Sequence, residues 1–178
     1  HPPLFVKKCG ENLAYPLTYI FNHSLCSGKL PALWKRARVV LVHKKGNENN
    51  VSNYRPICIL SCFSKLLERL VYPTFSLHME PILNDFQHGF RKGRSTETNL
   101  LAYTSHISHV VDSGLQVDAI YTDFSSAFDK VDHTLLLSKL EAYGIFGALL
   151  AWFASYLEGR VQFVSVNGFE SSLYYALS

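Results

Sequence analysis

The 178-residue sequence predicts an α+β fold, because segments with helical periodicity are interspersed with short β-rich runs. Apolar residues make up 48% of the chain and charged residues 17%, a balance that favours a packed core over disorder. In the last third, strand-like and helix-like segments alternate, which is typical of α/β or α+β domains. A chain of this length forms one domain, or one domain and part of another.

The helices are predicted from apolar residues that recur at spacings of three and four. Gly28 ends the first of them, Ser61 is a possible N-cap of the second, and Ser95 or Thr96 caps the third. Pro73 is expected to kink or break the second helix, because proline cannot donate the helical hydrogen bond. The predicted helices are 11–27, 61–80, 95–112, 134–143 and 146–157.

The strands are predicted from β-branched or alternating runs bounded by turn residues. The polar segment 44–53 predicts a turn after the first strand, and Asn167-Gly168 predicts a two-residue hairpin with a primed turn between the last two. A Gly- and Arg-rich connection is expected over 84–94. The predicted strands or extended segments are 36–43, the region near Arg55, 116–122, 160–166 and 169–177.

Charge is distributed unevenly along the chain. Residues 1–115 contain 14 Lys or Arg against 7 Asp or Glu, whereas residues 116–178 contain 3 against 7. A basic front and an acidic back suit a protein whose first part holds a polyanion and whose second part holds metal. An uneven solvated surface explains the same counts without any ligand.

The cysteines and the apolar runs bear on the protein's setting. The four cysteines follow no disulfide or zinc spacing, so we expect buried thiols and a reducing, intracellular location, with nucleus and cytoplasm not distinguished. The longest apolar stretch, 144–157, is about 14 residues against the roughly 20 that span a bilayer, which predicts a buried helix and no membrane partner. No signal peptide precedes the first periodic segment, and both ends look like cuts rather than natural termini.

Asp123 is the first candidate site residue, because it follows the predicted strand 116–122. A carboxylate held at a strand end can bind the divalent ions that phosphoryl transfer requires. One Asp is not sufficient for two ions, and an Asp in this position is a helix N-cap at least as often.

The string TDFSSAFDKVDH, residues 122–133, closely resembles motif A of the reverse transcriptases of non-LTR retrotransposons, nearest the jockey-like elements. Other segments resemble further blocks of the same family in the same order along the chain. These segments are 29–46, similar to the finger strand; 53–60 with 65–69, similar to the first block; 87–96, similar to the second; and 152–168, similar to the segment after motif A.

The resemblance implies right-hand polymerase fingers over 1–115 and an incomplete ferredoxin-like palm over 116–178. It also implies RNA-directed DNA synthesis, in which Mg²⁺ assists the addition of dNTPs to a DNA primer on an RNA template. Motif B and the Tyr-x-Asp-Asp hairpin of the family would lie beyond residue 178, and the sequence contains no Asp-Asp pair. The two-ion site is therefore expected only in a full-length enzyme, and this chain alone is expected not to polymerise; its oligomeric state is left open.

Three site residues follow from motif A. By the resemblance, Asp123 is the catalytic metal ligand, and the backbone carbonyl of Phe124 shares an ion. Phe128 matches the aromatic residue whose ring leaves no room for a 2′-hydroxyl on the incoming nucleotide. Without the resemblance, Phe128 reads as a core residue.

The remaining site residues are cations and one aromatic residue. Lys44, Lys45 and Arg55 match the fingers cations that hold the incoming triphosphate, although the lysine pair alone is also compatible with a solvated turn. Arg91 and Arg94 lie in the segment similar to the second block, and with Gly89 and Gly93 they allow close approach to a nucleic-acid backbone. Phe90 between them either stacks on a base or is buried as an anchor of the loop.

Two other functions remain open. The first is a non-catalytic, nucleic-acid-binding relic of a retrotransposon, whose salt-dependent RNA binding survives Asp123→Ala because Lys and Arg supply the phosphate contacts. The second is a different metal-dependent phosphotransferase built around Asp123, which requires a second carboxylate cluster.

Overall fold

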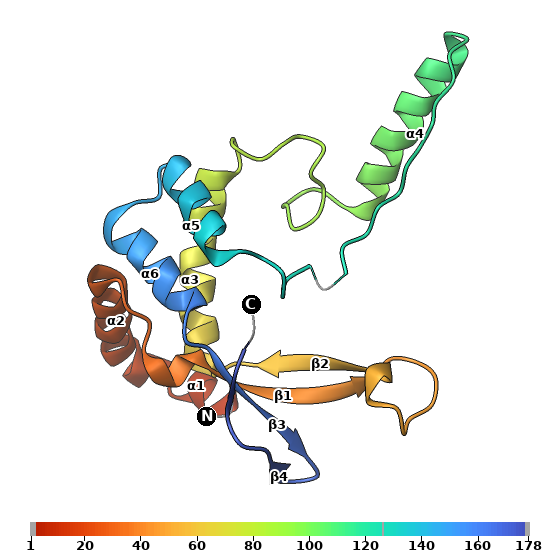
Figure 1. Cartoon of the computed structure of the whole chain (residues 1–178). Coiled ribbons are helices and arrows are strands. Elements are labelled where there is room, and N and C mark those ends of the chain that lie inside the picture. The colour runs from red at the N-terminus through yellow and green to blue at the C-terminus, as the bar shows by residue number, and fades with distance from the viewer. Residues whose placement is uncertain (1–2, 126, 177–178) are drawn as a thin grey trace. The chain divides into compact units, whose positions relative to one another are not determined.

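The computed structural model describes residues 3–125 and 127–176, which fall into two compact units. Unit 1 is formed by residues up to 75 and from 127 onward, and unit 2 by residues 76–126. Unit 1 contains a small mixed sheet together with helices, and unit 2 contains a long helix and its flanking loops (Figure 1). The predicted α+β class is confirmed.

The sheet of unit 1 has five strands with β1 and β3 at its centre. β1 is antiparallel to β2 and parallel to β3, and β3 pairs antiparallel with both β4 and β5. Between β3 and β4, Asn167 and Gly168 have φ values of 49° and 85°, which confirms the predicted primed turn. The strands are β1 (Arg36–His43), β2 (Tyr54–Ile59), β3 (Val161–Val166), β4 (Phe169–Glu170) and β5 (Tyr174–Tyr175).

The strand predictions over 36–43 and 160–166 and near Arg55 are thus confirmed, whereas the single strand expected over 169–177 is two short ones. Position 177 lies outside the described residues. β1 alternates as a half-buried strand should, with Ala37 and Val39 buried between exposed arginines. The guanidinium of Arg36 lies 4.6 Å from the ring centre of Phe163 on the parallel neighbour.

The helices of unit 1 cover the predicted segments 11–27, 134–143 and 146–157 and the first part of 61–80. A short N-terminal helix that the sequence did not predict precedes them. The helices are α1 (Pro3–Lys8), α2 (Gly10–Ser27), α3 (Cys62–Met79), α5 (His133–Ala142) and α6 (Gly147–Leu157), with 3₁₀ turns η1 (Ala32–Lys35) and η2 (Val51–Asn53). The core gathers where α2, α3, α6 and η1 meet, and its buried residues are Phe21, Leu30, Trp34, Leu67 and Trp152.

A polar contact fixes α6 against α2 inside this core. The indole Nε1 of Trp152, a residue only 2% exposed, donates to the hydroxyl of Ser24 at 3.1 Å. That hydroxyl in turn donates to the backbone carbonyl of Lys29 at 2.6 Å. Because every buried polar atom in this chain of contacts has a partner, the pair costs little to bury. Gly28, which lies between Ser24 and Lys29 in sequence, ends α2 in the left-handed conformation, as predicted.

Of the kink or break expected at Pro73, the break is not found: α3 is continuous through the proline. Proline removes one hydrogen bond, to the carbonyl of residue 69, and both Pro73 and Arg69 are exposed, so water can satisfy that carbonyl. The predicted N-cap is confirmed, since the Ser61 hydroxyl accepts from the backbone N–H of Ser64 at 3.1 Å.

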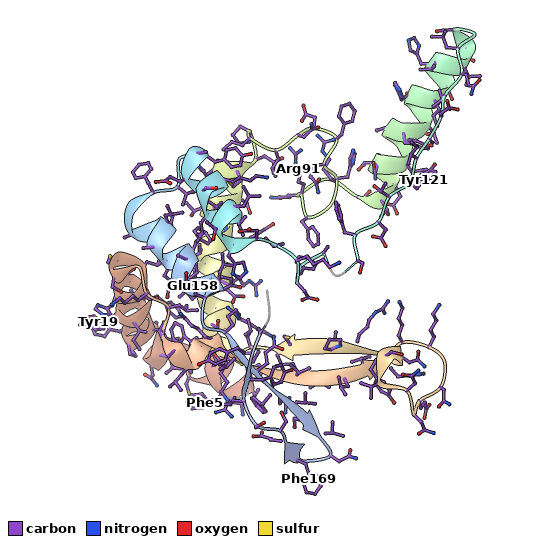
Figure 2. The ribbon with its side chains drawn as sticks, viewed as in Figure 1. Phe5, Tyr19, Arg91, Tyr121, Glu158 and Phe169 are labelled. Carbon is purple, nitrogen blue, oxygen red and sulfur yellow. The ribbon has the colours of Figure 1, made fainter. Side chains whose placement is uncertain are left out.

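Unit 2 contains the end of α3, the connection 80–95, helix α4 (Thr96–Asp112) and an extended return segment. Ser95 caps α4 as predicted, and forms a capping box with Thr98. The strand expected over 116–122 is wrong: this segment has no regular structure and runs back beside α4, where the hydroxyls of Tyr103 and Tyr121 lie 2.6 Å apart (Figures 1 and 2). A strand needs a neighbour for its backbone groups, and no described strand pairs with this one.

The cysteine prediction is also wrong in part. Cys26 and Cys58 are exposed and Cys9 and Cys62 half-buried, so none is a fully buried thiol. All four are free thiols. Helix α6 is half-buried rather than buried, with Trp152 its one fully covered side chain. Within the described ranges, no helix combines the length and hydropathy needed to cross a membrane.

Candidate nucleotide and nucleic-acid interface

The β1–β2 hairpin of unit 1 brings three predicted cations to one end of the sheet. Lys44 and Lys45 follow the last residue of β1, and Arg55 stands on β2 directly opposite Val42. The hairpin is closed there by a hydrogen bond from the Lys44 backbone N–H to the Asn53 carbonyl at 2.8 Å. All three cationic residues are exposed, and no ion pair to them is found among the described residues. Their arrangement can hold a polyanion.

The turn that carries the lysines is held by its own side chains. The amide of Asn53 donates to the Asn47 carbonyl at 2.9 Å, and the Tyr54 hydroxyl donates to the Glu48 carbonyl at 2.9 Å. Gly46 has φ 86°, and a Cβ there would lie only 2.8 Å from the Asn53 amide nitrogen. The turn is therefore ordered before any ligand arrives, which lowers the entropy cost of binding.

Asp123 and Phe124 lie in unit 2, at the end of the extended segment beside α4. Both are exposed, with Phe124 at 84%, and no hydrogen bond to the Asp123 carboxylate is found in the described parts of the chain. Just before them, the hydrogen bond that Tyr103 shares with Tyr121 raises the pKa of Tyr103. The carboxylate is accessible, but it is not held at a sheet edge as the sequence predicted.

A metal site needs several such ligands close together. Over residues 3–125 and 127–176, no group of three His, Cys, Asp or Glu side chains gathers in a way that could hold an ion. Asp132, which follows in the same motif, is used locally: it is the N-cap of α5 and accepts from the Leu135 N–H at 2.9 Å. The described residues therefore do not by themselves fit a two-ion centre.

Phe128 lies in unit 1 and is 80% exposed, so the alternative that it is a core residue is wrong. Phe90, in unit 2, is 90% exposed, so the alternative that it is a buried loop anchor is also wrong. Both rings are accessible to a ligand.

The loop that carries Phe90 also holds the two predicted arginines, and they differ in environment. Arg91 is labelled in Figure 2. Its side chain is only 5% exposed and is paired with Glu80 at 2.6 Å. Arg94 is 33% exposed, with its nearest guanidinium nitrogen 3.6 Å from Asp85. The ionic environment of Arg91 was missed by sequence reasoning, because its partner Glu80 stands eleven residues away along the same connection.

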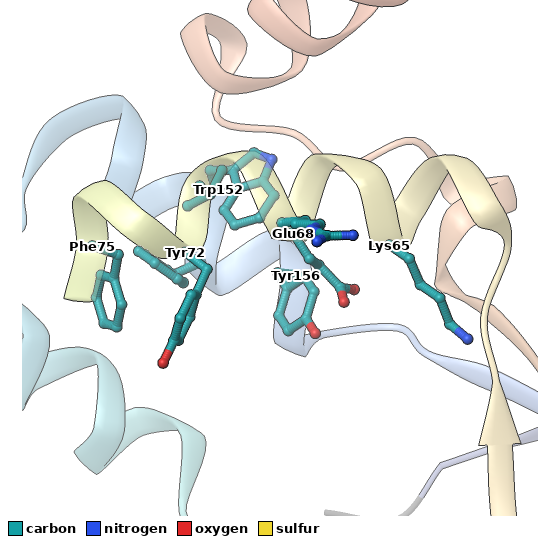
Figure 3. A pocket seen from close by; sticks show the side chains of 9 residues that line it. Lys65, Glu68, Tyr72, Phe75, Trp152 and Tyr156 are labelled. Atoms are coloured by element: carbon teal, nitrogen blue, oxygen red, sulfur yellow. The ribbon is translucent and has the colours of Figure 1, made fainter. Parts of the chain in front are cut away.

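Sequence reasoning also missed a groove between α3 and α6 in unit 1 (Figure 3). It has a volume of about 520 Å³ and an aromatic wall, in which Trp152 stacks on Tyr156 with ring centres 5.5 Å apart. Burial, and then the carboxylate of Glu68, raise the pKa of Tyr156. Two exposed cations, Lys65 and Arg69, are among the residues that line it. Their spacing of four places them on one helix face, but which helix faces α3 was not readable from the sequence.

Comparison with known proteins gives a consistent result across most of the chain. Residues 42–176 match the family model described as reverse transcriptase (RNA-dependent DNA polymerase). The chain is 36% identical over 160 residues to the probable RNA-directed DNA polymerase from transposon BS of Drosophila melanogaster, a match covering 85% of this chain and 17% of that protein. It is 32% identical over 161 residues to the RNA-directed DNA polymerase from mobile element jockey of the same species, covering 88% and 17%.

A third relative is the probable RNA-directed DNA polymerase from transposon X-element of Drosophila melanogaster, 33% identical over 150 residues, covering 81% of this chain and 16% of that protein. The chain thus spans about one sixth of the length of the relatives it matches. The predicted resemblance is confirmed: the chain belongs to the reverse transcriptase (RNA-dependent DNA polymerase) family and corresponds to a part of the polymerases of non-LTR retrotransposons.

Proposed function

We propose that this chain supplies the fingers, residues 1–115, and part of the palm, residues 116–178, of a polymerase that copies an RNA template onto a DNA primer. Family membership supports RNA-directed DNA synthesis as the reaction class. The incoming substrate is a dNTP, and its triphosphate carries the charge that the fingers must hold.

The observation that carries the proposal is the cationic end of the β1–β2 hairpin. Lys44, Lys45 and Arg55 are exposed there, on a turn fixed by hydrogen bonds within the hairpin. The guanidinium of Arg55 can hold two phosphate oxygens at once, while each ammonium acts as a point charge. A triphosphate held by three cations on a rigid hairpin is oriented as well as bound.

In this proposal Asp123 provides one carboxylate ligand for Mg²⁺, and the backbone carbonyl of Phe124 adds a second oxygen. A divalent ion bound there would neutralise charge on the phosphate oxygens. Among the described residues no group of three His, Cys, Asp or Glu side chains could complete an ion site around Asp123, so a two-ion centre needs ligands from elsewhere in a full-length enzyme. Phe128 lies against the sugar and excludes a 2′-hydroxyl by the volume of its ring.

The connection between α3 and α4, residues 80–95, is the proposed nucleic-acid contact of unit 2. It carries Phe90, Arg91 and Arg94 on a loop anchored to helices at both ends. Phosphate contacts from its exposed cations fix position along the strand without reading sequence.

The nucleotide part is tested by equilibrium binding of a fluorescent dNTP to this chain, with and without Mg²⁺. Arg55→Ala should weaken binding by about 10-fold or more, because hydrogen bonds to charged groups contribute about 1.5–3 kcal/mol. Lys139→Ala is the matched control, since Lys139 is an exposed lysine of unit 1 on α5. Equal affinities of the two variants would contradict the assignment of the hairpin.

Asp123→Ala separates the polymerase from the non-catalytic relic in the same assay. The proposal expects the Mg²⁺-dependent increase in dNTP affinity to disappear in this variant while metal-free binding remains. A relic that keeps only the basic fingers shows no Mg²⁺-dependent increase even in the parent chain.

A further inference from the structure

The loop between α3 and α4 is tied down by an arginine that faces inward. Arg91 donates from Nε and Nη2 to one carboxylate oxygen of Glu80, at 3.1 and 2.6 Å, and from Nη1 to the backbone carbonyl of Asn84 at 2.8 Å. Its side chain is 5% exposed. Three of its five donors and its charge are therefore already used within the loop.

Arg91 is one anchor of the loop, and His88, which precedes Phe90 in sequence, is a second. His88 is 8% exposed, and its Nδ1 lies 2.9 Å from the hydroxyl of Thr98 on α4. Thr98 itself belongs to the capping box of that helix, accepting from the Ser95 backbone N–H at 2.8 Å. The loop is thus joined to the helix that follows it, and Arg91 ties it to Glu80, the first residue after α3.

Phe90 stands between His88 and Arg91 in sequence. It is 90% exposed and has φ 62°, in the left-handed region that a bulky side chain rarely adopts. Such a conformation persists only where the surrounding contacts hold it, and residues of this kind cluster at functional sites. An aromatic ring held in a strained backbone and displayed to solvent is poorly explained as a packing residue.

We propose that Arg91 is a positioning residue that does not contact phosphate, and that the loop it locks presents Phe90 for stacking on an unpaired base of single-stranded nucleic acid. This inference rests on the proposed function, which makes nucleic acid the ligand. It adds that different residues of the loop hold the loop in place, stack on a base and contact phosphate. Phosphate contacts come from Lys92, which is exposed, and Arg94, which is 33% exposed. Stacking on an aromatic ring tolerates any base, as copying of an arbitrary template requires.

The two possible roles of Arg91 predict opposite effects of one substitution. If Arg91 were a phosphate contact restrained by Glu80, then Glu80→Gln would release it, tighten RNA binding and steepen the salt dependence. If Arg91 positions the loop, Glu80→Gln loosens the loop and weakens binding about 3- to 10-fold with an unchanged salt slope. Arg94→Ala should behave differently from both, reducing the slope by about 0.7.

Phe90 is tested by variants that leave the anchors in place. Because the ring is exposed, Phe90→Leu should not impair folding, and it should weaken binding about 10-fold through loss of stacking. Phe90→Trp should bind as well as the parent, and its indole fluorescence should be quenched by the bound base. Phe86→Leu is the matched control in the same loop, since Phe86 is 83% exposed.

The probe is a short fluorescein-labelled single-stranded RNA of mixed sequence, and binding is followed by anisotropy from about 50 to about 200 mM salt. Tighter binding by Glu80→Gln, or equal affinities of Phe90→Leu and Phe86→Leu, overturns the inference while leaving the proposed function standing. Failure of the parent chain to bind at the lowest salt overturns the nucleic-acid part of both. Weaker binding by Glu80→Gln at constant slope, with quenching in Phe90→Trp, supports the inference.

Discussion

Replacing Gly28 with alanine should destabilise unit 1 through both backbone strain and a steric clash. Gly28 ends α2 in a Schellman arrangement, in which its own N–H bonds to the Leu25 carbonyl and the Lys29 N–H bonds to the Ser24 carbonyl. Its φ is 66°, and an added Cβ would lie 2.7 Å from the Cβ of Ala151 and 3.1 Å from the carbonyl oxygen of Ala148.

Two costs therefore add. The left-handed conformation costs an L-residue about 1–2 kcal/mol. Forcing a methyl group into a packed helix contact costs about 1–3 kcal/mol more, because the neighbours are backbone and a short side chain that cannot swing aside. Gly28→Ala should thus lower the free energy of unfolding by about 2–5 kcal/mol, a large part of the 5–15 kcal/mol typical of a folded domain.

Gly159→Ala is the matched control for this experiment. Gly159 has φ 62° in the same unit, but nothing lies within 4 Å of the position its Cβ would take. It should show the conformational cost alone, about 1–2 kcal/mol. Urea unfolding followed by tryptophan fluorescence measures both, since Trp152 reports on this contact. Equal losses in the two variants would refute the close approach of α2 and α6 at Gly28.

Two further predictions concern the same core. Ser24→Ala leaves the buried Nε1 of Trp152 without its acceptor, so unfolding in urea should require about 1–3 kcal/mol less free energy, and an unchanged midpoint would disprove the contact. Burial and the Glu68 carboxylate raise the pKa of Tyr156 in the folded chain. As the pH rises, the Tyr156 hydroxyl therefore ionises in the unfolded chain before it ionises in the folded one. Its contribution to the free energy of unfolding is complete below about pH 10 and is lost as the pH rises further. Tyr156→Phe should remove that part of the alkaline decline in the urea midpoint, whereas Tyr15→Phe, at an 85% exposed position, should keep it, and identical pH profiles of the two variants would contradict the assignment.

Local signals in the sequence predicted most of the regular structure. The β-branched run 36–43 is β1 with the same bounds, and the Asn167-Gly168 turn has the primed geometry expected of that pair. Ser95 caps α4, because a short hydroxyl side chain reaches the first free N–H groups of a helix wherever the chain begins one. Family membership was readable for a similar reason: the motif strings are contiguous residues in a defined order.

The failures share a different property. The segment 116–122 has the alternation of a strand, yet it lacks a neighbour to pair with among the described residues. Pro73 lies within a continuous α3, where the exposure of Arg69 lets solvent reach the carbonyl that the proline leaves without a donor. In both cases the outcome depends on what lies beside the segment rather than on its own residues.

The features of the candidate site are also of two kinds, those local in sequence and those formed only on folding. Residue types and their order identified the cationic hairpin, the motif A aspartate and the aromatic residue of the α3–α4 loop, because these features are local in sequence. The pairing of Arg91 with Glu80, the display of Phe90 and the aromatic groove beside Tyr156 arise from residues that meet only after the chain folds. The sequence gives the charge and the chemistry of each side chain. Which hydrogen-bond donors are already satisfied depends on which residues lie close together in the folded chain. This proximity decides whether an arginine is available to a ligand or holds a loop in place.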